Sequence, residues 1–130
     1  MAEPPTPLGT QHWPTEIRLR KAEKILEIDF DNGVTVRLPA ELLRVESPSA
    51  EVQGHGAHQK QLIAGRAHVG ITAVEPVGNY AVRIVFDDLH DTGIYSWSYL
   101  YELGERQPEL WAAYLKALAE RGLSREPTRS

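Results

Sequence analysis

The 130-residue chain has no cysteine. This absence excludes disulfide bonds, thiolate nucleophiles, cysteine-ligated zinc and self-ligated iron–sulfur clusters. No apolar stretch approaches the roughly 18 residues that a membrane span needs. The N-terminal stretch MAEPPTPLGTQHWP also lacks the basic start and apolar run of a secretory signal. We therefore expect a cytoplasmic protein that does not bind a membrane.

The chain also lacks an excess of positive charge. Its 18 Asp and Glu outnumber its 14 Lys and Arg, which leaves a formal net charge of −4 and no long-range attraction to nucleic acid. Phosphate-binding motifs are missing as well, because neither Gly-Lys-Ser/Thr nor GxGxxG stands between a strand and a helix. These absences argue against binding of nucleic acid and of nucleotides.

Length and composition fit one globular domain. Residues 1–14 carry four of the nine prolines and show no apolar periodicity, which predicts a disordered leader. The single domain is expected to occupy residues 15–122. Residues 123–130 are polar and are expected to form a flexible tail.

Strands are indicated where apolar and polar residues alternate. Asp31-Asn32-Gly33 separates two such runs and supplies residues that tolerate a positive φ, which predicts a β-hairpin. Gly78-Asn79 joins a second pair of runs in the same way. The five expected strands cover residues 17–20, 26–30, 34–38, 69–77 and 80–86.

Helices are indicated near Pro39 and in the C-terminal third of the chain. Ser96 is a good N-cap for a helix that Gly104 is expected to end, and a second helix is expected between Pro108 and Gly122. The polar run 46–61 is expected to be a long loop. We therefore predict an α+β fold with a mostly antiparallel sheet of about five strands and a C-terminal helical pair packed on one face.

An aromatic run, Tyr95, Trp97, Tyr99 and Tyr101, follows an acidic cluster around His90. On a helix, residues 97 and 101 share one face while 95 and 99 lie elsewhere, so a single core cannot bury both sets equally. One set is expected in the core. The other is expected to form an exposed binding patch, because tyrosine and tryptophan are favoured at interfaces.

The histidines allow two kinds of chemistry, each with a simpler alternative. His55 and His58 lie three apart in the loop and, with His90, could hold a metal, but solvated loop histidines are common. Asp87, Asp88 and Asp91 could form an acid–base pair with His90. A turn in which His90 bonds the backbone explains the same residues. We favour the turn, because the sequence offers no partner nucleophile.

Four pieces of sequence carry a resemblance to a known family: LEIDFDNGVTVRLPAELLRVESPSAEV, GHG, VGI and DLHDTGIYSWSYL. They resemble the small domain found at the N-terminus of gamma-butyrobetaine hydroxylase and in short stand-alone bacterial proteins, a DUF971-like domain. The similarity runs from about residue 17 to residue 103. The catalytic jelly roll of the hydroxylase has no counterpart in this chain, so hydroxylase activity is not expected.

The resemblance also implies a structural zinc held by three cysteines and a histidine. The matching positions are Ser47, Ser49, Val52 and His90, so only the histidine is present. Because serine and valine do not replace thiolates at zinc, we expect hydrogen bonds rather than a metal to hold this region.

Similar domains are joined to Mrp-type P-loop ATPases that deliver iron–sulfur clusters, which implies an accessory role with such a carrier ATPase as partner. Our leading hypothesis is a non-enzymatic interaction domain without a cofactor. Its contact surface would involve Tyr95, Trp97, Tyr99, Ser47 and Ser49 with the 47–58 loop. The alternative is a small zinc- or iron-binding protein that uses His55, His58 and His90. A small-molecule pocket between sheet and helices is a third possibility.

Overall fold

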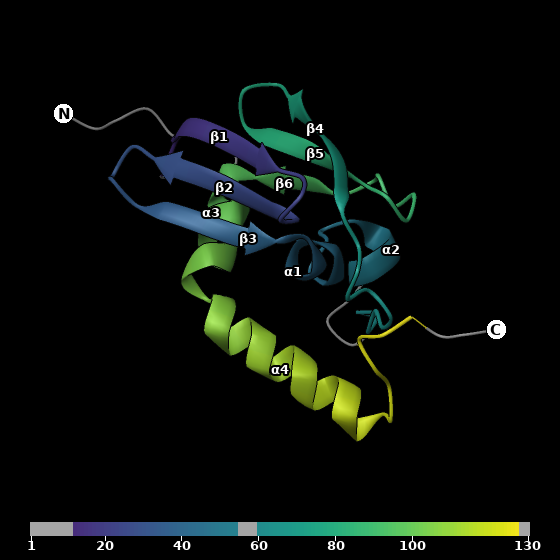
Figure 1. Ribbon diagram of the computed structural model, residues 1–130. Helices are drawn as coiled ribbons and strands as arrows, with labels where there is room; N and C mark the ends of the chain where they lie inside the picture. The colour runs from purple at the N-terminus through teal and green to yellow at the C-terminus, as the bar shows by residue number, and fades with distance from the viewer. Residues whose placement is uncertain (1–11, 55–59, 128–130) are drawn as a thin grey trace.

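The computed structural model describes residues 12–54 and 60–127. Within these residues, six strands form two three-stranded antiparallel sheets (Figure 1). The first sheet has the order β1 (Pro14–Arg20), β2 (Ile25–Phe30), β3 (Thr35–Pro39). The second has the order β4 (Ile71–Val77), β5 (Ala81–Phe86), β6 (Ile94–Ser96).

The α+β class is therefore confirmed, but the expectation of one sheet of about five strands is wrong. After Pro39 the chain turns into α1 (Ala40–Val45), so β3 does not pair with β4. The second sheet is completed by β6, which has only three residues and is too short to show an alternating pattern.

The predicted hairpin at Asp31-Asn32-Gly33 is confirmed, and the two strands expected to meet at Gly78-Asn79 form a second hairpin. In the first, Leu26 pairs with Leu38 across β2 and β3, and Gly33 in the turn has a φ of 86°. In the second, β4 and β5 pair on either side of Gly78, whose φ is 55°. Glycine adopts these angles without steric cost, which is why these turns were readable from the sequence.

The main core lies between the two sheets, α1 and α3 (Trp97–Glu105). Its fully buried side chains come from every one of these elements. They include Leu26, Ile28, Leu38, Leu43, Ile84, Phe86, Tyr95 and Leu100.

The predicted start of helix α3 is correct, whereas its predicted end is not. The Ser96 hydroxyl accepts a hydrogen bond from the Tyr99 backbone N–H at 3.1 Å, which confirms the predicted N-cap. Gly104, however, lies inside the helix and does not end it. A Cβ atom at this position would lie 2.3 Å from Val36 Cγ1, so glycine allows α3 to approach β3 closely.

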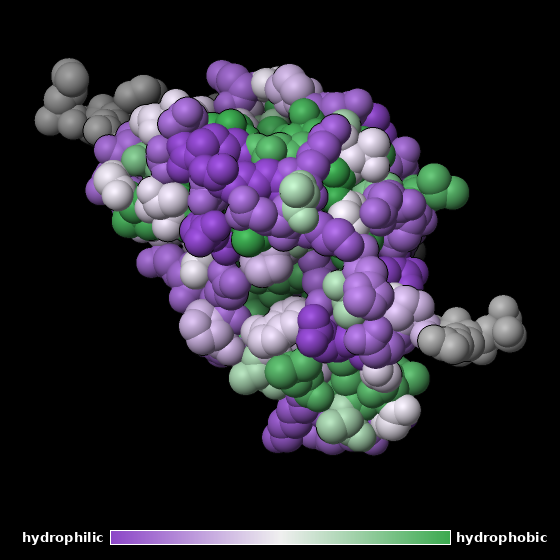
Figure 2. All heavy atoms as spheres, viewed as in Figure 1, coloured by the Kyte–Doolittle hydropathy of each residue, from purple (hydrophilic) through white to green (hydrophobic). Residues whose placement is uncertain are grey.

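Helix α4 (Gln107–Glu120) extends away from the sheets (Figure 1). Tyr114 and Leu118 pack with Val45 of α1 in a second, smaller apolar cluster. Thus α3 packs on β3 whereas α4 contacts α1 and residues 62–64, which differs from the expected helical pair on one face. Figure 2 shows hydrophobic side chains gathered over the region of α4. Leu115, a residue of α4, is 40% exposed.

The expected loop 46–61 contains a short helix, α2 (Ala50–Gln53). His55 and His58 lie outside the described residues. At the C-terminus, the Ser124 and Arg125 carbonyls accept hydrogen bonds from the Gly65 and Ala67 N–H groups, where a flexible tail was expected. None of the helices in the described ranges combines the length and apolar character of a membrane span.

Candidate functional site around His90

The His90 side chain joins two parts of the chain that are far apart in sequence. Its Nε2 atom lies 2.9 Å from Ser47 Oγ and 3.4 Å from Ser49 Oγ. Its Nδ1 atom lies 3.2 Å from Glu51 Oε2. The histidine follows β5, whereas its partners lie just before and within α2. The ring therefore fastens the α1–α2 region to the second sheet.

The surroundings of His90 keep its imidazole neutral. Burial lowers its pKa, and the nearby Arg44 charge lowers it further, which outweighs the opposite effects of Glu51 and Asp88. A neutral imidazole has one donor and one acceptor nitrogen. Nδ1 donates to the Glu51 carboxylate and Nε2 accepts from the Ser47 hydroxyl, so both ring nitrogens have a hydrogen-bond partner.

Asp88 sits between two arginines next to the histidine. Its Oδ2 atom accepts from Arg44 Nε at 2.8 Å and from Arg66 Nε at 2.7 Å, and its Oδ1 atom accepts from the His90 backbone N–H at 3.1 Å. Burial opposes ionisation of Asp88, but these hydrogen bonds and the Arg44 charge together hold its pKa below the ordinary value. The carboxylate is thus charged and fixes three groups at once.

These contacts build a tight turn over residues 86–90, which we call the Leu89 turn. The Leu89 N–H donates to the Phe86 carbonyl at 3.2 Å, and the Phe86 N–H donates to the His90 carbonyl at 3.0 Å. Leu89 has a φ of 76° and its side chain is 88% exposed. A left-handed conformation costs a residue with a Cβ atom about 1–2 kcal/mol. The turn therefore holds a large apolar side chain in water in a strained conformation.

The predicted aromatic patch requires a correction. Tyr95 is 0% exposed and its hydroxyl donates to the Leu43 carbonyl at 2.5 Å. Trp97 is 6% exposed and donates to the Asn79 carbonyl at 2.9 Å. Tyr99 is half-buried and donates to the Glu46 carbonyl. The prediction from helical spacing was wrong because Tyr95 belongs to strand β6, where it points into the core.

Burial of these tyrosines also decides their ionisation. It is the largest cause of the raised pKa values of Tyr95 and Tyr99. Both phenols therefore stay protonated and keep donating to the backbone of residues 43 and 46. Their role in the described structure is to hold the segment that leads to Ser47.

Ser47, His90 and Glu51 are connected in the same order as the serine, histidine and carboxylate of hydrolases. Ser47 is 0% exposed, however. A Cβ atom on Gly93 would lie 2.5 Å from Ser47 Oγ, so the backbone of Gly93 covers the hydroxyl. An acyl substrate cannot reach a nucleophile that is enclosed in this way. The three residues therefore act as a structural hydrogen-bonded unit.

The donor set does not fit the zinc site that the resemblance implies. The structure brings Ser47 and Ser49 to His90, but hydroxyl groups are poor substitutes for thiolates, and Val52 is a buried apolar residue. The described ranges 12–54 and 60–127 contain no group of three His, Cys, Asp or Glu residues that could hold a metal. A site that adds His55 and His58 to His90 stays a prediction, because both lie outside these ranges.

Sequence reasoning identified Ser47, Ser49, Asp88 and His90, and the family resemblance led us to expect hydrogen bonds in this region, but the atoms that pair were not predicted. It also missed Arg44 and Arg66, which are indistinguishable in the sequence from surface arginines. No feature of the sequence predicts the exposed, left-handed conformation of Leu89, because leucine rarely adopts it.

Comparisons with known proteins agree with this fold. Two proteins with NMR solution structures are 50% and 49% identical to the chain, and the matches cover 92% and 96% of it and 94% and 93% of those chains, each with a TM-score of 0.79. A crystal structure of a protein of unknown function from Acidithiobacillus ferrooxidans, which belongs to the DUF971 family, is 42% identical. This match covers 70% of this chain and 91% of that one, with a TM-score of 0.60.

No curated protein matches the chain. The model of the family described as gamma-butyrobetaine hydroxylase-like, N-terminal, matches residues 17–101, which include the Leu89 turn and the residues around His90. The resemblance seen in the sequence is thereby confirmed, and the chain belongs to the gamma-butyrobetaine hydroxylase-like N-terminal family.

Proposed function

We propose that this chain is a non-catalytic interaction domain that contacts a partner protein through the Leu89 turn. The observation that carries the proposal is the conformation of Leu89, whose side chain is 88% exposed at a φ of 76°. A single exposed leucine needs no explanation. An exposed leucine that a buried network holds in a strained conformation does need an explanation. Such strain persists where the surroundings impose it, and it is concentrated at functional sites.

The network around the turn supports a rigid presentation of this side chain. Asp88 and His90, on either side of Leu89, are fixed by Arg44, Arg66, Ser47 and Glu51. A side chain that is already ordered loses less conformational entropy on binding, so a given contact gives a higher affinity. Because Ser47 is enclosed, a substrate has no access to its hydroxyl.

The charges near the turn indicate the partner's chemistry. Asp87 is exposed, and no basic side chain in the described ranges forms an ion pair with it. Asp91 forms a partly exposed pair with Arg83 at 3.5 Å. We therefore expect a partner with an apolar socket bordered by basic residues. The iron–sulfur carrier ATPases suggested by the resemblance are the first candidates.

The test compares two leucines that are exposed on different parts of the molecule. Leu89→Asp and the control Leu115→Asp, in α4, are each titrated against a purified Mrp-type ATPase from the same genome, and both are used to capture partners from the source lysate. An anchor in an interface contributes at least about 2 kcal/mol, so Leu89→Asp should weaken binding at least about 30-fold. A partner that binds both variants like the wild type would contradict the proposal.

The alternative function is metal binding through His90 with His55 and His58, and it requires different contacts of His90. His90 would have to exchange its contacts with Ser47 or Glu51 for a metal ion. Elemental analysis of the untagged protein and of His90→Ala tests it directly. One zinc or iron per chain that is lost in the variant would favour the metal site over the hydrogen-bonded network.

A further inference from the structure

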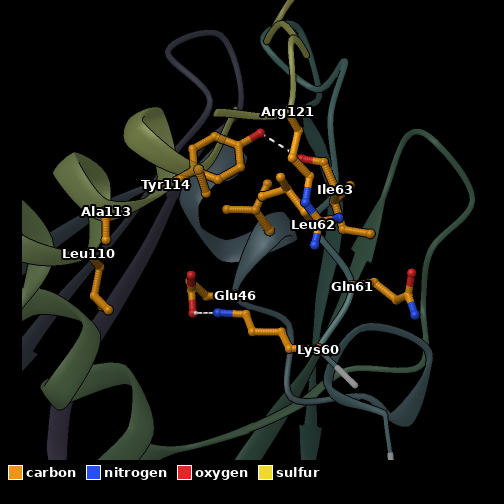
Figure 3. A pocket seen from close by; sticks show the side chains of 11 residues that line it. Glu46, Lys60, Gln61, Leu62, Ile63, Leu110, Ala113, Tyr114 and Arg121 are labelled. Atoms are coloured by element: carbon orange, nitrogen blue, oxygen red, sulfur yellow. Dashed lines mark hydrogen bonds and ion pairs between the residues drawn. The ribbon is translucent and has the colours of Figure 1, made fainter. Parts of the chain in front are cut away.

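A cleft separates α4 from residues 60–63, away from the contacts of His90. Its volume is about 290 Å³, close to the lower limit of about 300 Å³ that is typical of small-molecule sites. Figure 3 shows Leu110, Ala113 and Tyr114 of α4 on one side and Leu62 and Ile63 on the other. The walls of the cleft are therefore mostly apolar.

Two hydrogen-bonded contacts hold the walls in place. The Tyr114 hydroxyl donates to the Ile63 carbonyl at 2.6 Å, and Lys60 Nζ donates to Glu46 Oε1 at 2.7 Å. Burial raises the pKa of Tyr114 to about 12, so the phenol remains a donor at neutral pH. The cleft is thus formed before any ligand binds.

The cations that border the cleft differ in their partners. Lys60 is paired with Glu46, whereas no carboxylate in the described ranges forms an ion pair with Arg121. Arg121 follows the last residue of α4 and lines the cleft at the end opposite the Glu46–Lys60 pair (Figure 3). A guanidinium group offers a planar fork of donors that matches a carboxylate.

From this arrangement we propose that the cleft binds a small amphipathic carboxylate, with its apolar chain between α4 and residues 62–63 and its carboxylate on Arg121. The apolar walls favour the chain by the hydrophobic effect. The guanidinium, with which no carboxylate in residues 12–54 and 60–127 pairs, selects the anionic end. This site is separate from the Leu89 turn, so a test of the cleft does not depend on the proposed partner contact.

The experiment is an NMR titration of the full chain with sodium octanoate, with octanol as the uncharged control. We expect saturable shifts of the Leu62, Ala113 and Tyr114 backbone amides with a Kd of about 1 mM or below. Octanol should bind at the same residues about fivefold more weakly, since it lacks the charge. No saturable shifts with octanoate, or shifts confined to other residues, would overturn the proposal.

Two substitutions separate the charge from the apolar walls. Arg121→Gln should reduce the affinity for octanoate to that for octanol, whereas Arg106→Gln at the other end of α4 should change neither. Ala113→Phe should fill the cleft and abolish the shifts with both ligands. Equal octanoate binding by Arg121→Gln and the wild type, or unchanged shifts in Ala113→Phe, would show that the ligand does not bind as proposed.

Discussion

Replacement of Asp88 by alanine should destabilise the protein strongly, because its carboxylate compensates a buried positive charge. Arg44 is only 8% exposed, and its buried Nη1 atom has no hydrogen-bond partner among the residues that the structure describes. The substitution would also remove the acceptor for Arg44 Nε, for Arg66 Nε and for the His90 N–H. The guanidinium of Arg44 would then remain largely buried without the carboxylate that pairs with it.

The size of this loss follows from the burial of the pair. Removing one partner of a buried ion pair costs about 3–5 kcal/mol. The Asp88 side chain is 20% exposed, so we place the expected loss at the lower end, about 3 kcal/mol. With a urea m-value of about 1.5 kcal/mol/M, the midpoint of unfolding should fall by about 2 M. Tryptophan fluorescence can follow the transition, since Trp97 lies in the core.

Asp91→Ala is the matched control. Its carboxylate is 49% exposed and lies 3.5 Å from Arg83, so its loss should cost less than about 1 kcal/mol. A loss of less than about 1 kcal/mol in Asp88→Ala, or an equal shift of the midpoint in both variants, would show that Asp88 does not compensate a buried charge.

Three further predictions concern single residues. Because the pKa of His90 is lowered in the folded protein, the unfolded chain binds more protons than the folded chain. The free energy of unfolding in urea should therefore fall as the pH drops from about 7 through the ordinary histidine pKa of about 6.5. The fall should be smaller in His90→Gln. Gly104→Ala should cost about 2 kcal/mol despite its better helix propensity, and less when Val36→Ala makes room, in thermal unfolding. Ser47 should resist labelling by a fluorophosphonate probe, read by intact mass, because its hydroxyl is enclosed; rapid labelling would contradict the structural role.

Local features were readable from the sequence because short-range physics determines them. The turns at Gly33 and Gly78 need residues that tolerate positive φ, and Ser96 caps the helix that follows it. In each case the residue that carries the signal lies next to the structure it produces. Such features do not depend on where the rest of the chain lies.

Long-range arrangements were not readable in the same way. Ser47 and His90 are 43 residues apart, so nothing local reveals their contact, although the family resemblance brought them into one set. Tyr95 was assigned to a helical pattern that begins only at Trp97, and this error placed a core residue on the surface. The conformation of Leu89 is imposed by Asp88 and His90 from both sides, against the preference of leucine itself.

One substitution tests whether the network around Asp88 and His90 imposes the strained Leu89 turn for the sake of a partner contact. Leu89→Gly removes the side chain and suits a φ of 76°. We expect this variant to be more stable than the wild type by about 1 kcal/mol in urea unfolding, yet to bind the partner at least about 30-fold more weakly. A variant that gains stability and retains full affinity would show that Leu89 is strained without serving the contact.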